Sequence, residues 1–483
     1  MRKVAMLFAL VVALGIGLVG SALAGLDFGL DEQNLLASKS QVLFGLGKPI
    51  DDSSQNSIDQ VTAEADPTDL VTLANGLSAK VVTAAANAGP NIDMMAPWPN
   101  ATNPTWLIAC NEQGTGDPGV QRINISTGVV ETIVVSGLTS CDPARATPWG
   151  TIVFAEEDGP HGQLFELIDP LNTTGVAIQG GTPTCTSPPA AAACTGATNI
   201  VERTAVGNLS FEGIGITPNG VMYYGDELRP SNGTPGGAYF KFVPSCAPAG
   251  TCPTGTLPGA TNADKLENSP LTDGTIFGLR LGKRGTAPGT DYGQGTETGL
   301  GSWIEVPGLN LTSQAGTLKL TGYYRPEDLE FDFEAIADGD VRLCANNTGN
   351  EEVDQAYGST ICLTDGTLEQ AADNTATPEV QFLVIGNPQF AMMDNIAYQP
   401  GRGNWTIHED GDQLLGNNDL WDCLPDGGDD NLLSDGCVRI GTLNDLEAEW
   451  TGGIFDASGK RFFVSVQHNV TGHGVVLEIT GWK

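Results

Sequence analysis

Alternating apolar and polar positions recur along the chain from residue 91 onward, in units that read as β-hairpins. In the clearest unit, Phe211-Glu212 opens an alternating apolar segment that ends at a Pro218-Asn219-Gly220 turn. A second alternating segment follows and ends at the acids Asp226-Glu227. Period-two alternation on both sides of a Pro-Asn-Gly turn is typical of two antiparallel strands.

The same plan recurs at irregular spacings, which we attribute to loop insertions. The units span residues 93–112, 149–157, 212–227, 327–346, 394–410 and 449–468, and 149–157 is the least complete. This repetition predicts an all-β fold, a six-bladed β-propeller. A large β-sandwich is the alternative, but its hairpins would resemble one another less. Segments 180–200 and 245–270, rich in Pro, Thr, Gly and Cys, predict disulfide-stapled insertions in surface loops.

The first residues are typical of a secretory signal peptide. Arg2 and Lys3 precede an apolar run, and Ala22-Leu23-Ala24 supplies a small-residue cleavage site. A membrane anchor is the alternative, but the apolar run is short for a bilayer span. We therefore divide the chain into a signal peptide at 1–24, an N-terminal arm at 25–88 and a β-propeller domain at 89–483.

Ten cysteines follow the signal peptide. An even number in an exported chain predicts disulfides, although the sequence alone does not prove their pairing. The spacing favours pairs between sequence neighbours, for example Cys185 with Cys194 and Cys246 with Cys252. The expected location is periplasmic or extracellular.

Acidic residues dominate the charge of the chain. The 483 residues include 22 Lys+Arg and 58 Asp+Glu, for a formal net charge of -36 at pH 7. This balance argues against a nucleic-acid partner and against docking on an anionic membrane, because both need basic patches. The acids therefore either keep the protein soluble or bind cations.

Many of these acids stand where a hairpin strand begins or ends. In an antiparallel hairpin, the start of the first strand and the end of the second lie at the same end. If the hairpins surround an axis, these positions converge on one face: Asp93, Glu112, Glu156, Glu157, Glu212, Asp226, Glu227, Glu327, Asp394, Asn395, Glu409 and Asp410. Crowded carboxylates repel one another, and hard cations such as Ca²⁺ or Fe³⁺ would relieve the repulsion. Solvated strand-end acids are the alternative interpretation.

Two other side chains lie at hairpin mouths. Arg325, within Tyr324-Arg325-Pro326-Glu327, is suited to bind an oxyanion in bidentate fashion; the alternative is an ion pair with a neighbouring acid. His468 ends a hairpin strand and is either part of the same face or a structural histidine. The chain contains no G-x-S-x-G nucleophile elbow.

The order of these motifs resembles that of the PhoX-type alkaline phosphatase family. The matching segments are Thr147-Pro148-Trp149-Gly150-Thr151 with Glu156-Glu157, Phe211-Glu212-Gly213, Tyr324-Arg325-Pro326-Glu327-Asp328, Asp394-Asn395-Ile396-Ala397, Glu449-Trp450-Thr451-Gly452 and Phe463-Val464-Ser465-Val466-Gln467-His468. The resemblance runs from about residue 90 to the C-terminus. It implies a six-bladed propeller whose central site holds Ca²⁺ and Fe³⁺ through acidic side chains and hydrolyses phosphomonoesters.

The resemblance also implies roles for individual residues. It makes Arg325 the catalytic residue that binds phosphate. It makes metal ligands of Glu156, Glu157, Glu212 and Glu327, with Asp226, Asn395, Glu409 and Asp410 in the same ring.

Two departures from the family pattern bear on the cofactor. The family's phosphatases carry a cysteine just before the acid pair, as a thiolate ligand to iron, and here that position is Ala155. They also tend to carry a twin-arginine export signal, which this chain lacks. Both departures argue against Fe³⁺ and leave Ca²⁺ as the expected cofactor.

The sequence thus predicts a secreted, metal-dependent phosphomonoesterase, a monomer acting on a small phosphorylated substrate. Two alternatives stay open: a non-catalytic calcium-binding propeller and a calcium-dependent esterase or lactonase.

Overall fold

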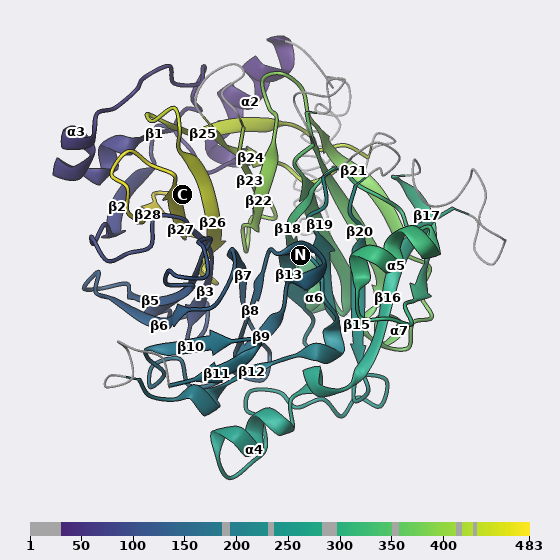
Figure 1. Ribbon diagram of the computed structural model, residues 1–483. Coiled ribbons are helices and arrows are strands. Elements are labelled where there is room, and N and C mark those ends of the chain that lie inside the picture. Colours follow the sequence, from purple (N-terminus) through teal and green to yellow (C-terminus); the bar gives the residue numbers. More distant parts are fainter. Residues whose placement is uncertain are drawn as a thin grey trace, which may run out of the picture.

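The computed structural model describes residues 30–185, 194–229, 236–282, 297–349, 357–411, 418–427 and 432–483 (Figure 1). The predicted signal peptide lies outside these residues. Among the helices that the structure describes, none has the length and apolar character that crossing a bilayer requires.

Strands dominate the structure and form five sheets. In order of pairing, the first sheet comprises β11 (Thr182–Thr184), β10 (Val176–Gln179), β6 (Val130–Ser136), β5 (Val120–Asn124), β4 (Trp106–Asn111) and β3 (Ile92–Trp98). The second comprises β12 (Ile200–Glu202), β9 (Leu164–Leu167), β8 (Ile152–Glu156) and β7 (Cys141–Ala146). The third comprises β13 (Phe211–Ile216), β14 (Met222–Asp226), β15 (Tyr239–Pro244), β16 (Gly274–Leu281), β17 (Gly299–Glu305), β21 (Glu379–Ile385), β20 (Ser359–Thr367), β19 (Asp340–Asn347) and β18 (Pro326–Phe331).

The remaining sheets contain the two ends of the chain. The fourth comprises β1 (Val71–Leu73), β25 (Cys437–Leu443), β24 (Asp419–Cys423), β23 (Trp405–Glu409) and β22 (Met393–Tyr398). The fifth comprises β2 (Ser78–Thr83), β28 (Val475–Thr480), β27 (Arg461–Gln467) and β26 (Glu449–Phe455).

Helices are short and lie in connections or before the first strand. They are α2 (Leu30–Leu43), α3 (Gln60–Ala65), α4 (Asn262–Glu267), α5 (Leu311–Leu318), α6 (Phe333–Asp338) and α7 (Leu368–Ala372), with 3₁₀ turns at Pro67–Leu70, Gly159–His161, Ala197–Asn199, Thr204–Val206 and Pro270–Thr272.

The sheets stand around a central axis, as the propeller prediction requires (Figure 1). The innermost strands β3, β7, β13, β18, β22 and β26 contact one another in chain order, and β26 returns to β3. Apolar side chains from adjacent sheets pack between them, for example Ile152 and Phe154 of β8 with Ile108 of β4. An all-β, propeller-like fold is therefore confirmed.

The sheets do not divide cleanly into six blades. Residues 211–385 form one nine-stranded sheet, because β17 pairs with β21 through Gly299 opposite Val380 and Leu300 opposite Glu379. This sheet supplies two innermost strands, β13 and β18. Repeating hairpins in the sequence reveal inner strands, but they do not reveal whether two outer edges join.

The predicted N-terminal arm enters the sheets instead of only packing on them. Strand β1 pairs with β25, and β2 pairs with β28 near the C-terminus. Leu36 and Phe44 belong to the same apolar cluster as Trp482. The first described residues therefore complete the last sheet and close the ring of sheets.

Five disulfides join the ten cysteines, each to its neighbour in sequence: Cys110–Cys141, Cys185–Cys194, Cys246–Cys252, Cys344–Cys362 and Cys423–Cys437. The predicted pairing of sequence neighbours is confirmed. This number of disulfides indicates folding in an oxidising compartment, as expected of an exported protein.

Candidate metal centre

Each innermost strand has a β-bulge near its axial end. The ladder register shifts between Ile92 and Met95, Cys141 and Ala144, Phe211 and Ile214, Pro326 and Leu329, Met393 and Ile396, and Thr451 and Ile454. A bulge bends the strand and redirects the side chain of the extra residue. The residues that directly follow the last regular pair are Asp93, Asp142, Glu212, Glu327, Asp394 and Gly452. Five of the inner strands thus present a carboxylate at the same position.

The second strand of each hairpin ends with a matching feature. In five hairpins, the residue after the strand donates its backbone N–H to the carbonyl oxygen of the residue just before the inner strand. These bonds are Glu112 to Asn91, Glu157 to Ser140, Glu227 to Ser210, Thr348 to Arg325 and Asp410 to Met392, at 2.7–3.0 Å. This bond holds the end of the second strand against the mouth of its own hairpin. Three of these residues, Glu112, Glu157 and Asp410, line the central cavity.

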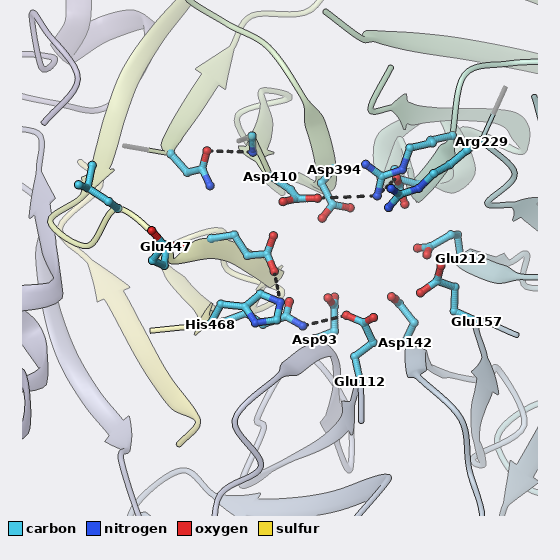
Figure 2. Close-up of a pocket in the computed structure, with 17 residues that line it drawn as sticks. Asp93, Glu112, Asp142, Glu157, Glu212, Arg229, Asp394, Asp410, Glu447 and His468 are labelled. Carbon is cyan, nitrogen blue, oxygen red and sulfur yellow. Dashed lines mark hydrogen bonds and ion pairs between the residues drawn. The ribbon is translucent and has the colours of Figure 1, made fainter. Parts of the chain in front are cut away.

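The two sets of side chains surround a cavity of about 290 Å³ on the axis (Figure 2). Its acidic lining residues are Asp93, Glu112, Asp142, Glu157, Glu212, Glu327, Asp394, Asp410, Glu447 and Glu449. The other charged lining residues are Arg229 and Arg325, and His468 also lines the wall. Negative groups therefore far outnumber positive ones in a small volume.

This crowding raises the pKa of the carboxyl groups. Burial, followed by repulsion from Glu227 and Glu112, raises the pKa of Glu157 to about 10. Burial raises the pKa of Glu327 to about 8, although Arg325 opposes the shift. The pKa values of Asp93, Asp142, Glu212, Asp394 and Glu449 are also well above their ordinary range, with burial as the first cause and neighbouring acids as the second. Without bound cations, several of these acids would hold protons at neutral pH.

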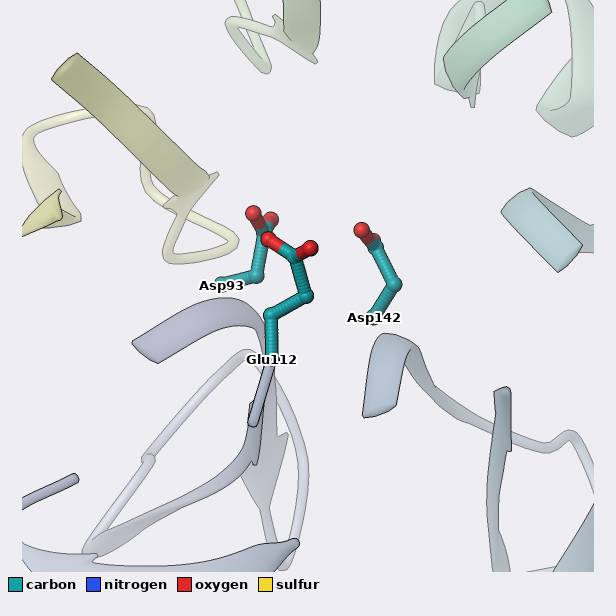
Figure 3. Close-up of side chains that lie close together, drawn as sticks. All are labelled: Asp93, Glu112 and Asp142. Atoms are coloured by element: carbon teal, nitrogen blue, oxygen red, sulfur yellow. The ribbon is translucent and has the colours of Figure 1, made fainter. Parts of the chain in front are cut away.

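The donor set fits hard cations. One oxygen each from Asp93, Glu112 and Asp142 lie within 4.8 Å of one another (Figure 3). Asp142, Glu157 and Glu212 meet the same condition, so Asp142 belongs to both triads. Oδ1 of Asp93 and Oδ1 of Asp142 are buried and, among the described residues, have no hydrogen-bond partner. Burying a carboxyl oxygen without a hydrogen-bond donor destabilises the fold unless a bound cation takes the place of the donor.

Arg325 lies at the edge of this cavity in a left-handed backbone conformation, with φ 55°. Its Nε donates to Glu227 Oε1 at 2.7 Å, and its Nη2 lies 3.2 Å from Glu327 Oε1. Burial acts against the charged form, but Glu327 and Glu227 outweigh it and raise the pKa of Arg325. The guanidinium is therefore a fixed positive charge beside the acids.

A second buried charged group links the innermost strands; we call Arg145, Asp328 and Glu330 the axial network. Arg145 of β7 lies 2.8 Å from Glu330 and 3.1 Å from Asp328, both on β18. It also donates to the carbonyl oxygens of Ile214 and Leu329. One side chain thus ties three innermost strands together.

Two of the predicted ligands, Glu156 and Glu409, do not line the cavity. Glu156 accepts backbone N–H groups of Thr139 and Gln163 at 2.9 and 3.2 Å. Glu409 does the same for Ala391 and Asp419, both at 3.0 Å. Their neighbours Glu157 and Asp410 face the cavity instead, because consecutive side chains of a strand point to opposite sides.

Asp226 and Asn395 also lie beside the cavity and not on it. Asp226 accepts the backbone N–H of Ser210 at 3.2 Å, and burial raises its pKa to about 7. Asn395 accepts the backbone N–H of Gly452 at 2.6 Å and so links β22 to β26. Among the predicted metal ligands, the structure brings Glu157, Glu212, Glu327 and Asp410 to the cavity.

Sequence reasoning did not include Asp142 in the converging set, although a signal for it was present. The turns Thr147-Pro148-Trp149-Gly150 and Thr217-Pro218-Asn219-Gly220 are alike, and the proline of each lies six residues beyond the corresponding acid, Asp142 or Glu212. Counting back from the turn would have identified Asp142. Glu449 was also outside that set, and its Oε1 lies 3.1 Å from Nε2 of His468 on the cavity wall.

Ala155, the position at which the PhoX-type pattern has a cysteine, is not among the residues that line the cavity. It is fully buried and packs in an apolar cluster with Val153 and Leu164. The absence of a thiolate at this position leaves the set of cavity carboxylates intact.

The fold and the site together define a class: β-propeller proteins with a carboxylate-lined axial cavity. No protein-family model matches the chain, and no curated protein matches its sequence. Among solved structures, the chain is similar to PhoX of Pseudomonas fluorescens in complex with vanadate, a transition state analogue. The TM-score is 0.56 at 17% sequence identity, and the match covers 89% of this chain and 98% of that chain.

Two other similar structures have lower TM-scores. A gluconolactonase from Xanthomonas campestris has a TM-score of 0.42 at 10% identity, covering 89% of this chain and 96% of that chain. Regucalcin, a calcium-binding protein from Agrobacterium tumefaciens, has a TM-score of 0.41 at 9% identity, covering 84% and 96%. The likeness to PhoX, with its TM-score of 0.56, supports a PhoX-like propeller fold.

Proposed function

We propose that this chain is an exported, metal-dependent phosphomonoesterase that hydrolyses small phosphate esters at the axial cavity. One observation carries the proposal: two carboxylate triads that share Asp142 line the same small cavity as the partly buried guanidinium of Arg325. The likeness in fold to PhoX, solved in complex with vanadate, a transition state analogue, supports it. We count β13–β17 and β18–β21 as two joined blades, which makes the proposed propeller six-bladed.

The cavity would hold at least two cations. Asp93 and Glu112 would help to hold one, Glu157 and Glu212 the other, and Asp142 belongs to both groups of acids. All of these donors are carboxylate oxygens, and every cysteine of the chain is in a disulfide, so Ca²⁺ is the cofactor we propose. Bound cations would neutralise the phosphoryl group and stabilise the charge that develops on its oxygens.

The protein's own contribution would be to position the substrate. Glu227 and Glu327 hold Arg325 through Nε and Nη2, which fixes the plane of the guanidinium. Its remaining N–H groups would bind phosphoryl oxygens in bidentate fashion. Burial lowers the local dielectric constant, so this charge acts more strongly than it would in water.

Phosphate release from 4-nitrophenyl phosphate tests the proposal. We expect turnover by the calcium-loaded protein, loss of turnover with a chelator, and loss in Arg325→Gln but not in Lys39→Gln, a change of the same charge on exposed helix α2. Metal analysis of the native protein would show calcium. No phosphate release with or without added calcium and iron overturns the proposal, and hydrolysis of 4-nitrophenyl acetate alone would assign esterase chemistry instead.

A further inference from the structure

The rim of the cavity carries a second arginine that the proposed reaction does not use. Arg229 follows β14 and lines the cavity together with Arg325. Its side chain is 69% exposed, whereas that of Arg325 is 14% exposed. The two arginines therefore mark two depths of one cavity, Arg325 inside and Arg229 at the mouth.

Both arginines form an ion pair with the same carboxylate oxygen. Oε1 of Glu227 lies 2.7 Å from Nε of Arg325 and 3.5 Å from Nε of Arg229. Arg325 has further acids beside it, since its Nη2 lies 3.2 Å from Glu327 and 3.8 Å from Asp410. The charge of Arg229 is thus the less neutralised of the two, and its long side chain is free to reorient at the mouth.

The opposite side of the mouth is acidic. Figure 2 shows Glu447 across the cavity from Arg229, and Glu447 is exposed. A ligand that leaves the cavity therefore passes between a positive and a negative side chain. An anionic group on that ligand is attracted to Arg229 and repelled by Glu447.

The two arginines are close enough for one ligand to meet both. Nε of Arg325 and Nε of Arg229 lie 2.7 Å and 3.5 Å from the same oxygen, Oε1 of Glu227. A phosphoryl group beside Arg325 therefore leaves the rest of its substrate near Arg229. We propose that Arg229 is a specificity-determining residue that selects substrates with a second anionic group on the leaving-group side of the phosphoryl group. The inference rests on the proposed function, because it places the phosphoryl group beside Arg325.

Two non-hydrolysable probes test this without turnover. Methylphosphonate carries only the phosphoryl-like group, and phosphonoacetate adds a carboxylate. Calorimetric titration of the calcium-loaded protein should give an affinity for phosphonoacetate about tenfold higher than for methylphosphonate, the value of one charge-assisted hydrogen bond.

Three variants sharpen the test. Arg229→Gln should reduce the tenfold preference to less than threefold, and Arg229→Lys should keep part of it because the charge remains. Glu447→Gln, the matched change on the opposite rim, should not lower the affinity for phosphonoacetate. Lys39→Gln controls for net charge. Thermal melting of each variant shows that it folds.

The outcomes separate the two proposals. Equal affinities in the wild-type protein, or a preference that survives Arg229→Gln, overturn the role of Arg229 and leave the phosphatase proposal standing. If neither probe binds the wild-type protein, both proposals fail together.

Discussion

Strands β7 and β18 each contribute to two buried charged regions, one in which the acids are paired with an arginine and one in which acids far outnumber basic groups. At the cavity, Asp142 and Glu327 face many other acids and few cations. Three residues further along β7, Arg145 bonds both Asp328 and Glu330 in the axial network. The same two strands therefore carry the axial network, whose acids have a basic partner in the protein, and cavity acids that mostly lack one.

The pKa values record the difference. Burial raises the pKa of Asp328 to about 7, and the positive charge of Arg145 limits this rise. Burial and neighbouring acids act in the same direction on Glu157 and raise its pKa to about 10. The axial network stabilises itself with internal partners, whereas the cavity depends on protons or on cations from solution.

The largest effect should come from the shared carboxylate, Asp142. Asp142→Asn removes a charge from both triads, so we expect turnover of an aryl phosphate to fall about 1,000-fold, since cations supply several kcal/mol of transition-state stabilisation. The metal-free variant should melt higher than the metal-free wild type, because the amide fills the buried position without having to bind a proton or carry a charge. Phosphate release measures the turnover, and scanning calorimetry measures the melting temperatures. A lower metal-free melting temperature would show that Asp142 has a structural partner instead.

Disrupting the axial network should damage the fold itself. Arg145→Met leaves Asp328 and Glu330 buried without their cation, which we expect to cost about 3 kcal/mol of unfolding free energy. Denaturant titration measures this, and added calcium should not restore it. The triple variant with Asp328→Asn and Glu330→Gln should recover part of the loss. Full rescue by calcium would mean that the two regions are not independent.

The pH dependence of stability separates the regions next. Glu327 and Glu157 keep protons in the metal-free fold up to pH about 8 and about 10, whereas the unfolded chain releases them near 4.5. The folded protein therefore binds more protons than the unfolded chain in this window, and stability falls as pH rises, by roughly 1.4 kcal/mol per pH unit for each proton. Melting curves from pH 5 to 9 should show this decline with a chelator and lose it with calcium. A flat metal-free profile would contradict the crowding of acids.

The smallest predicted difference is between adjacent residues of one hairpin. Glu157→Gln should weaken calcium binding about tenfold, because Glu157 belongs to a triad. Glu156→Gln should keep calcium affinity and lower stability by about 1 kcal/mol, because each carboxyl oxygen accepts a backbone N–H and the amide replaces one of these oxygens with an NH₂ group that cannot accept. Calcium titration of both variants is the measurement. Equal loss of affinity would place Glu156 at the metal centre after all.

Much of the site followed from hairpin geometry alone. Strand ends that carry acids are visible in the sequence, and antiparallel pairing brings both ends of a hairpin to one place. This reasoning placed seven residues correctly on the cavity wall: Asp93, Glu112, Glu157, Glu212, Glu327, Asp394 and Asp410. It did not include Asp142, because that hairpin was recognised only from its second strand onward.

The choice between neighbouring acids was decided only by the tertiary structure. Glu156 with Glu157 and Glu409 with Asp410 are equivalent as sequence, yet one of each pair bonds backbone N–H groups and the other faces the cavity. A shift of one residue reverses which side of a strand a residue faces, and the bulge in each inner strand introduces such a shift.

The sequence by itself determined the β-hairpins, the pairing of cysteines with their neighbours and the strand ends at which acids gather, because each depends on residues close together in the chain. Three features emerge only in the folded chain: the joining of two outer edges into one nine-stranded sheet, the bonds of Arg145 to β13 and β18, and the choice of carboxylates that meet. Those features depend on the register and closure of strands far apart in sequence, and local patterns of polarity do not encode either.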